Sequence, residues 1–308
     1  GLSAGYELCK NQQGNLFGMK KEIFTCLALA CCVQGFSQTD SISLDSVENH
    51  RIIVPTPAVQ SSKIYRLKPA VDIPLTAVTA GWSIYAFPII YSKDTSTTAQ
   101  ILALNKNDLA AINRHGVKHY SENAKNTSDY LFYGAMPLPL ILLVDKEIRK
   151  DAARVGFLYL EAMSVTGILY TGAAYVKDKY RPYAYNPEVP IEKRKAGGAK
   201  NSFFGGHPAL VGTSTFFIAK VYSDYHPESR IKWVLYSAAG AATLATSYLR
   251  YKGGLHFTTD LIIGTAIGPL SGILVPHFHK VKKDKGAGLG LTPYYNGQAQ
   301  GFALTYRF

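Results

Sequence analysis

Six long stretches of apolar residues, separated by polar segments, dominate the middle of the chain. They lie at residues 71–91, 130–144, 155–176, 207–225, 231–248 and 257–275. Each stretch is longer than a typical strand and has the length of a buried or membrane helix. Three of them approach the roughly 20 residues that a helix needs to cross a bilayer, and the others are marginal. The pattern therefore predicts an all-α fold: a six-helix bundle that is apolar and embedded in a membrane.

The segments around these stretches carry other patterns. Residues 102–115 predict a short amphipathic helix, and the linker at 183–202, rich in Pro, Lys, Arg and Gly, predicts a mobile loop. In the tail, residues 286–308 alternate between apolar and small or polar residues on either side of Asn296-Gly297. This dipeptide favours a two-residue turn, so we expect a short C-terminal β-hairpin.

The beginning of the sequence has the pattern of a leader. Met19 is followed by two lysines and by an apolar run that ends in small residues before residue 38. We interpret residues 1–18 as upstream sequence, 19–37 as a signal peptide and 38–70 as an N-terminal arm. The open alternatives are an uncleaved anchor helix or a lipoprotein acceptor at Cys31. The signal peptide predicts an exported protein of the bacterial cell envelope, membrane-associated or multi-pass.

The four cysteines all lie in that leader region: Cys9, Cys26, Cys31 and Cys32. The mature chain would then contain no thiol, which excludes a cysteine nucleophile and a thiolate metal site.

Composition narrows the class of partner. Charged residues make up 18% of the chain, below the typical share of about 25%. The formal net charge is nevertheless +12, which favours nucleic acid, anionic lipid or phosphate ligands. No nucleic-acid-binding motif is present in the sequence. We therefore expect a membrane and a lipid phosphate as partners, and no nucleic acid.

The junction between the fifth and sixth apolar stretches carries the most suggestive chemistry. Arg250, His256 and Asp260 stand there, around the pair Gly253-Gly254. On a helix, Asp260 would share a face with His256, hold one imidazole nitrogen and leave the other free as a nucleophile. Arg250 can offer a planar fork of donors to an oxyanion. The combination indicates phosphoryl chemistry, and the alternative is a capped helix end with a snorkelling arginine.

Two further stretches lie at helix ends that should face the same side. Arg181-Pro182 follows the third apolar stretch, and Gly205-Gly206-His207 opens the fourth. In an up-and-down bundle, these ends and the junction before the sixth helix lie together. The charged and imidazole side chains of all three stretches can therefore converge without a long loop.

The three stretches together resemble the motifs of the type 2 phosphatidic acid phosphatase superfamily, which includes lipid phosphate phosphatases and vanadium haloperoxidases. The third motif matches at Arg250, His256 and Asp260, and the resemblance extends over roughly residues 70–285. The first and second motifs diverge. The lysine of the first falls on Ala174, where Lys177 or Lys179 is a candidate replacement, and the remaining departures are Phe204-Gly205 for Pro-Ser and Leu249 for serine.

The resemblance implies a phosphatase-like helical domain at residues 71–285 that hydrolyses a lipid phosphomonoester or pyrophosphate through a phosphohistidine. His256 would be the nucleophile, Asp260 would stabilise its imidazolium form, and His207 would be the general acid and base. The phosphate would be held by Arg181, Arg250, Gly205, Gly206 and, as a further candidate, Lys177. This mechanism requires no metal or other cofactor.

Two other functions stay open from the sequence. A non-catalytic envelope protein of the same fold would explain the divergent motif positions, and a vanadate-dependent haloperoxidase would use the same anion cradle. We expect five further histidines to be structural, and Glu161 and Asp178 to be solvated or locally paired. These histidines are His115, His119, His226, His277 and His279.

Overall fold

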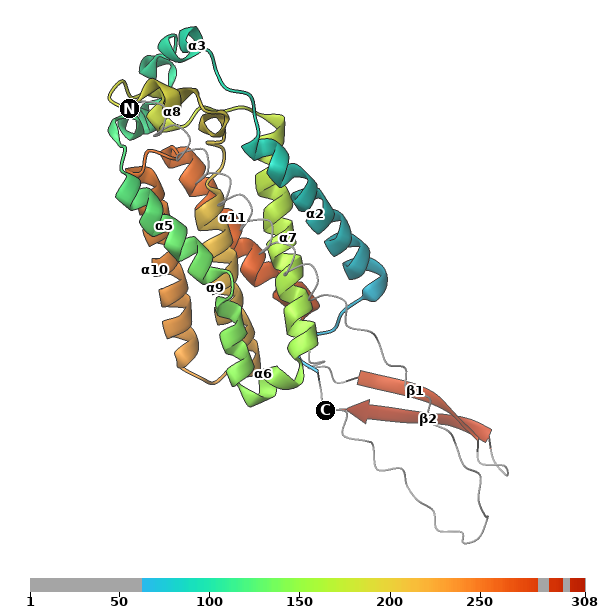
Figure 1. Cartoon of the computed structure of the whole chain (residues 1–308). Coiled ribbons are helices and arrows are strands. Elements are labelled where there is room, and N and C mark those ends of the chain that lie inside the picture. The colour runs from blue at the N-terminus through green and yellow to red at the C-terminus, as the bar shows by residue number, and fades with distance from the viewer. Residues whose placement is uncertain (1–62, 282–287, 296–299, 308) are drawn as a thin grey trace, which may run out of the picture. The chain divides into compact units, whose positions relative to one another are not determined.

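The computed structural model describes residues 63–281, 288–295 and 300–307 (Figure 1). Helices lie at all six predicted stretches. They are α2 (Pro69–Tyr91), α5 (Glu122–Ala135), α7 (Ala152–Val176), α9 (Gly206–Tyr225), α10 (Ile231–Lys252) and α11 (Thr258–His279). The all-α bundle predicted from the apolar pattern is confirmed in this part of the chain.

The second helix differs from its predicted bounds. It begins at Glu122, capped by the Ser121 side chain, and its α-helical part ends at Ala135. A 3₁₀ helix, η3 (Leu138–Val144), continues it. Pro137 and Pro139 lie at this change, and because proline lacks an N–H, it cannot continue the α-helical hydrogen-bond pattern.

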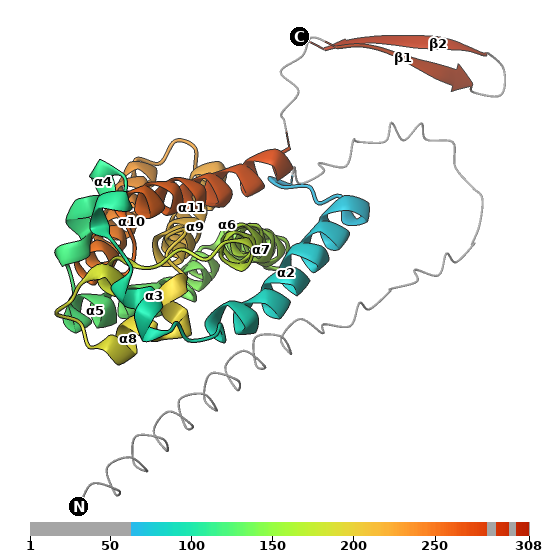
Figure 2. The same ribbon diagram turned by 90° about the horizontal axis from the view of Figure 1, so that it is seen from above.

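Helix α9 forms the centre of the bundle. It contacts α11, α10, α7 and α5, and most of its side chains are buried. Viewed along the bundle in Figure 2, α7 lies between α9 and α2, and α2 packs mainly against α7. The polar ends of α7, α9, α10 and α11 are therefore brought together by their common contact with α9.

The contact between α9 and α11 is close enough to require glycine. Three α11 glycines face carbonyl oxygens along α9, and a Cβ added to any of them would lie 2.1–2.5 Å from one of these oxygens. They recur at four-residue spacing, as Gly264, Gly268 and Gly272. Small residues at this spacing let two helix backbones approach directly. The beginning of α11 is thereby fixed against the beginning of α9.

Helix α2 buries polar side chains and exposes several of its apolar ones. Asp72, Thr76, Thr79 and Ser83 are among its buried residues, whereas Val78 is 66% exposed and Ile84 is 62% exposed. Apolar side chains favour this outward position when the surrounding medium is hydrocarbon.

Four helical segments are long and apolar enough to cross a membrane: Pro69–Tyr91, Glu122–Val144, Ala152–Val176 and Thr258–His279. Together with the outward apolar face of α2, they are the features of a membrane protein.

The predicted helix at 102–115 is wrong as a single element. The chain instead forms α3 (Thr98–Leu102), η1 (Lys106–Asp108), α4 (Ala111–Arg114) and η2 (His115–Lys118). The Asn105 side chain accepts a hydrogen bond from the Asn107 amide, and the Arg114 guanidinium donates to the carbonyls of Asn107 and Leu109. These local bonds compete with a continuous helix.

The linker at 183–202 also folds into helices: η4 (Pro182–Tyr185), α8 (Ile191–Lys195) and η5 (Gly197–Lys200). Ala184 and Val189 are buried, and the buried Arg194 side chain donates to the Ala184 carbonyl at 2.8 Å. The expected loop is therefore a packed segment. Figure 1 shows α8 beside α3 at one end of the bundle. One further short helix, α6 (Lys146–Lys150), precedes α7.

The predicted C-terminal hairpin is present as two antiparallel strands. They are β1 (Gly288–Tyr295) and β2 (Gln300–Arg307), with Leu291 opposite Leu304. The predicted turn at Asn296-Gly297 lies outside the described residues. So do the leader, its four cysteines and the arm as far as residue 62.

Candidate active site

The side chains predicted to converge come from four helix ends. Arg181 follows the end of α7, His207 is the second residue of α9, Arg250 is in the last turn of α10, and His256 lies just before α11. His256, Arg181 and Arg250 are almost completely buried. The charges of both arginines act on both imidazoles, so the structure does bring these four groups together.

His256 is held in one orientation by a backbone carbonyl. Its Nδ1 lies 2.6 Å from the Ser202 carbonyl oxygen. A carbonyl can only accept, so Nδ1 carries the proton and the neutral ring keeps its lone pair on Nε2. Burial, followed by the charges of Arg181 and Arg250, holds the pKa of His256 well below its usual value. A buried neutral imidazole with a fixed tautomer is suited to nucleophilic attack.

The structure does not pair Asp260 with His256, contrary to the prediction. Asp260 lies in the first turn of α11, where its carboxylate accepts a hydrogen bond from the Phe257 amide at 3.2 Å. The same carboxylate accepts from the Ser202 hydroxyl at 2.7 Å and from Lys179 Nζ at 2.5 Å. His256 precedes the helix, so the helical i to i+4 geometry does not apply to it. Asp260 acts on the imidazole only through Ser202, whose carbonyl holds the ring.

Asp129 on α5 joins the other two predicted groups and was missed by the sequence reasoning. One of its carboxylate oxygens lies 2.8 Å from Arg250 Nη1 and 3.0 Å from His207 Nε2. The other accepts from Lys125 Nζ at 3.1 Å. Asp129 directly precedes the predicted apolar stretch 130–144, among the polar residues that begin α5, so no pattern in the sequence singled it out.

The electrostatics keep His207 neutral in the absence of an anion. Burial and the Arg250 charge lower the pKa of His207 to about 4, although Asp129 acts in the opposite direction. Burial and the neighbouring Arg181 charge lower the pKa of Arg250 to about 10, so the guanidinium stays charged at neutral pH. A phosphate bound between the arginines would oppose their effect and raise the pKa of His207.

Arg181 has no counter-ion. In the part of the chain that the structure describes, its guanidinium forms no side-chain hydrogen bond or salt bridge, and its Nε is buried without a partner. Arg250 Nε is buried and unpartnered in the same way. A buried donor without an acceptor is costly, so the arrangement of these two side chains favours an anion between them.

A cavity of about 280 Å³ opens onto Arg181. Lys125 and Lys193 line it, and Lys193 donates to the Glu122 carboxylate at 2.6 Å and to the Tyr120 hydroxyl at 2.8 Å. The cavity therefore gives a negatively charged group access to the unpaired guanidinium along a basic wall.

The two predicted glycines differ in what they can offer. The Gly205 amide donates to the Asp260 carbonyl at 3.0 Å, so it is not available to a phosphate as predicted. A Cβ at Gly206 would lie 2.7 Å from the Tyr170 ring, which requires glycine for packing. The first turn of α9 has no side-chain cap, and the amides of Gly206 and His207 lack an intrahelical acceptor because of their position.

The predicted replacement Lys177 is exposed and lies outside the cluster. Lys177 is the C-terminal cap of α7. The backbone reaches the site two residues later, at Lys179, which pairs with Asn201 in an isolated parallel bridge. At the position of the lost motif lysine, the Ala174 carbonyl accepts from Lys93 Nζ at 2.6 Å. Lys93 also pairs with Asp178 at 2.6 Å.

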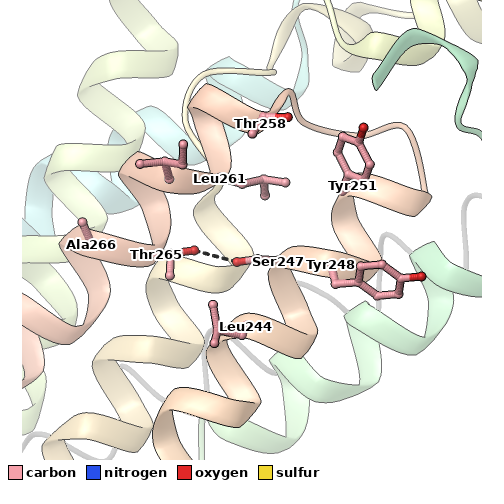
Figure 3. Close-up of a pocket in the computed structure, with 9 residues that line it drawn as sticks. Leu244, Ser247, Tyr248, Tyr251, Thr258, Leu261, Thr265 and Ala266 are labelled. Carbon is pink, nitrogen blue, oxygen red and sulfur yellow. Dashed lines mark hydrogen bonds between the residues drawn. The ribbon is translucent and has the colours of Figure 1, made fainter. Parts of the chain in front are cut away.

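An apolar groove of about 500 Å³ lies between α10 and α11 (Figure 3). Leu244, Tyr248 and Leu261 line it, and the Ser247 and Thr265 hydroxyls form a 2.6 Å hydrogen bond across it. Tyr251, the residue after Arg250, lines the same groove. The groove has the chemistry to accommodate a hydrocarbon chain.

Comparison with known proteins gives one family match: residues 155–284 match the PAP2 superfamily. The matched segment contains all four converging side chains and Asp260, which confirms the resemblance drawn from the motifs.

Two solved structures are similar to the chain. One is a transmembrane PAP2-type phosphatidylglycerolphosphate phosphatase from Bacillus subtilis, with 19% identity, a TM-score of 0.44, and coverage of 66% of this chain and 98% of that chain. The other is LpxE from Aquifex aeolicus, with 20% identity, a TM-score of 0.38, and coverage of 55% of this chain and 96% of that chain. No curated protein sequence matches the chain.

Proposed function

We propose that this protein is a phosphatase that hydrolyses a phosphomonoester or pyrophosphate of a lipid through a phosphohistidine intermediate. The observation that carries the proposal is the unpaired, buried guanidinium of Arg181 beside the neutral, fixed imidazole of His256. The first group requires an anion, and the second presents a lone pair. The match of residues 155–284 to the PAP2 superfamily supports the same reaction class.

The chemistry would proceed in two steps. His256 Nε2 attacks phosphorus and forms an N–P bond while the P–O bond to the leaving group breaks, and His207 donates a proton to the leaving oxygen. Water then attacks the phosphohistidine, His207 takes its proton, and inorganic phosphate leaves as the N–P bond breaks. Arg181 and Arg250 stabilise the charge that develops on the phosphoryl oxygens in both steps.

His207 can serve as the acid only when substrate raises its pKa from about 4. The phosphate group supplies that change, because its negative charge offsets the two arginines. Asp129, 3.0 Å from His207 Nε2, would stabilise the imidazolium form. The reaction is therefore coupled to binding: the proton donor becomes competent once the phosphoryl group is in place.

A lipid substrate is supported by the surroundings of the site. The groove between α10 and α11 is apolar and is lined in part by Tyr251, the residue after Arg250, while the cavity at Arg181 is basic. A phosphate joined to a hydrocarbon chain matches this pair of surfaces. The candidates are a phosphatidate-type lipid, an isoprenyl carrier phosphate or pyrophosphate, and lipid A.

The test is release of inorganic phosphate from a panel of these lipids in detergent, without added metal. We expect the wild-type protein to release phosphate and His256→Ala to lose the activity. His277→Ala is the matched control, because His277 is an exposed histidine near the far end of α11 and should leave the rate unchanged.

A second variant tests the intermediate. In His207→Ala, attack on a substrate with a good leaving group should still occur, but hydrolysis of the phosphohistidine should slow. Rapid quenching at alkaline pH should then recover labelled phosphate on the protein, and on His256 in particular. If folded wild-type protein releases no phosphate from any lipid, the non-catalytic alternative is correct and the proposal fails.

A further inference from the structure

Three ionisable side chains meet at the end of the bundle opposite the candidate active site. Asp72 is in the first turn of α2, Glu161 is in α7, and His279 is the last residue of α11. Helices α2 and α7 end, and α11 begins, at the active-site side (Figure 1). No pattern in the sequence connects these three residues, and the proposed phosphatase reaction does not use them.

Their ligand atoms form a compact set. His279 Nε2 lies 3.2 Å from Asp72 Oδ2 and 3.7 Å from Glu161 Oε2. All the ligand atoms lie within 4.8 Å of one another. For comparison, ligands bound tetrahedrally to zinc at 2.0–2.1 Å are about 3.3 Å apart. The three groups therefore need only small shifts to share one cation.

Glu161 points to a missing partner. Its side chain is 5% exposed, and Oε2 has no hydrogen-bond partner in the described part of the chain. The hydroxyl of Thr76, one turn along α2 from Asp72, is also buried without a partner. A carboxylate in this position requires a cation to offset the loss of hydration.

The backbone prepares His279 as a ligand. Its Nδ1 lies 2.8 Å from the Val275 carbonyl oxygen and so carries a proton, which leaves Nε2, facing the two carboxylates, as the ring nitrogen available to a metal ion. This is the usual arrangement of a metal-binding histidine, whose other nitrogen donates to a carbonyl or carboxylate. The Arg66 amide donates to the His279 carbonyl at 2.8 Å, which fixes the end of α11 against the chain that leads into α2.

We propose that Asp72, Glu161 and His279 bind a divalent transition-metal ion of the Zn²⁺ or Mn²⁺ type. Two carboxylates balance its charge within the bundle, and the imidazole favours these ions over Mg²⁺ and Ca²⁺, which prefer oxygen ligands. The nearest lysine on the chain, Lys280, is already paired with Asp224 at 2.6 Å. The ion would fasten α2, which otherwise packs mainly against α7, to both α7 and α11.

The test measures metal content and thermal unfolding of the full chain in detergent. After dialysis against EDTA and addition of one metal at a time, Zn²⁺ or Mn²⁺ should bind at one equivalent and raise the melting temperature by about 3 °C or more. Mg²⁺ and Ca²⁺ at the same concentration should have little effect. Co²⁺ should bind with visible absorption bands, which report on the ligand set independently of stability.

Variants locate the ion. Glu161→Gln and His279→Gln should each lose the bound equivalent and the shift in melting temperature. His277→Gln, two residues away on an exposed face, should keep both. The proposal is overturned if wild-type protein binds none of these ions, which would leave an imidazolium–carboxylate ion pair. It is also overturned if Glu161→Gln and His279→Gln both still bind one equivalent of metal. Where only His279→Gln folds, retention of the bound equivalent by that variant is enough to overturn it.

Discussion

The two ends of this helical bundle bury unpartnered atoms of oppositely charged side chains. Among the described residues, Arg181 Nε and Arg250 Nε are buried donors without an acceptor at the active-site end, whereas Glu161 Oε2 at the far end is a buried acceptor without a donor. Each costs the free energy of lost hydration unless a ligand supplies the missing partner. The sign of the unpartnered group therefore indicates the charge of the ligand: an anion at one end and a cation at the other.

The ends also differ in how the helices supply the groups. The anion cradle consists of Arg181, His207, Arg250 and His256. It is built from helix ends and loops, with Arg181 and His256 outside the long helices. The three residues of the far cluster, Asp72, Glu161 and His279, all belong to helices that are long enough to cross a membrane. The first arrangement leaves access for a substrate phosphate, and the second is suited to holding helices together.

Removal of Arg181 should have the largest effect. Arg181→Met should reduce phosphatase activity by about 10²–10³-fold, because it deletes a donor to the transferring phosphoryl group. Stability should stay the same or rise in the absence of anions, because an unpaired buried charge is lost. Steady-state phosphate release and thermal unfolding of the same preparation check both statements.

Arg250→Met is the matched comparison for that variant. It should also reduce activity, but it should destabilise the protein, because Asp129 loses its 2.8 Å contact with the guanidinium. Equal effects of the two variants on stability would contradict the distinction between a paired and an unpaired arginine.

Removal of the Asp260 charge should have the next largest effect. Asp260→Asn should lower the free energy of unfolding by about 2–4 kcal/mol, because the buried carboxylate accepts from Ser202, Lys179 and the Phe257 amide. Ser202→Ala keeps the carbonyl that holds His256 and should cost less. Denaturant unfolding measures both. A smaller loss for Asp260→Asn than for Ser202→Ala would show that Asp260 does not anchor this network.

The pH dependence of the free energy of unfolding should report on the two histidines of the anion cradle. The pKa of His207 is lowered to about 4 and that of His256 is lowered further from its usual value. As pH falls from about 6.5 toward 4, the unfolded chain binds protons that the native state does not. The free energy of unfolding should therefore decrease, by about 1 kcal/mol per pH unit for His207 alone.

Phosphate or vanadate should flatten that slope, because a bound anion raises the pKa of both histidines. Thermal unfolding between pH 4.5 and 7, with and without the anion, measures the difference. A slope that the anion does not change would mean that the anion does not bind between these groups.

The smallest effect is expected at the far end. In metal-free protein, Glu161→Gln should raise the free energy of unfolding by about 1 kcal/mol, since an amide costs less to bury than an unpaired carboxylate. With Zn²⁺ or Mn²⁺ present, the order of the two stabilities should reverse, and the wild type should be more stable than Glu161→Gln. Unfolding curves in EDTA and in metal provide the comparison, and the same order in both conditions would contradict a metal site.

The sequence by itself determined the helices and the main catalytic candidates. Apolar length and periodicity are local properties, so all six helical stretches could be located from them. Arg181, His207, Arg250 and His256 stand at the ends of these helices, and antiparallel packing of neighbouring helices is enough to bring such ends together. The alternating tail likewise predicted its antiparallel strands without tertiary information.

Only the tertiary structure decided how those side chains are partnered. His256 is held by Ser202, 54 residues earlier in the chain, and His207 meets Asp129 on α5, where no motif marks either partner. The helical spacing suggested Asp260 as the partner of His256, but α11 begins after His256 and turns that carboxylate toward Ser202 and Lys179. Asp72, Glu161 and His279 meet for the same reason. The local sequence pattern determines which face of a helix a residue occupies. Which other residues its side chain contacts is determined only by how that helix packs against the others.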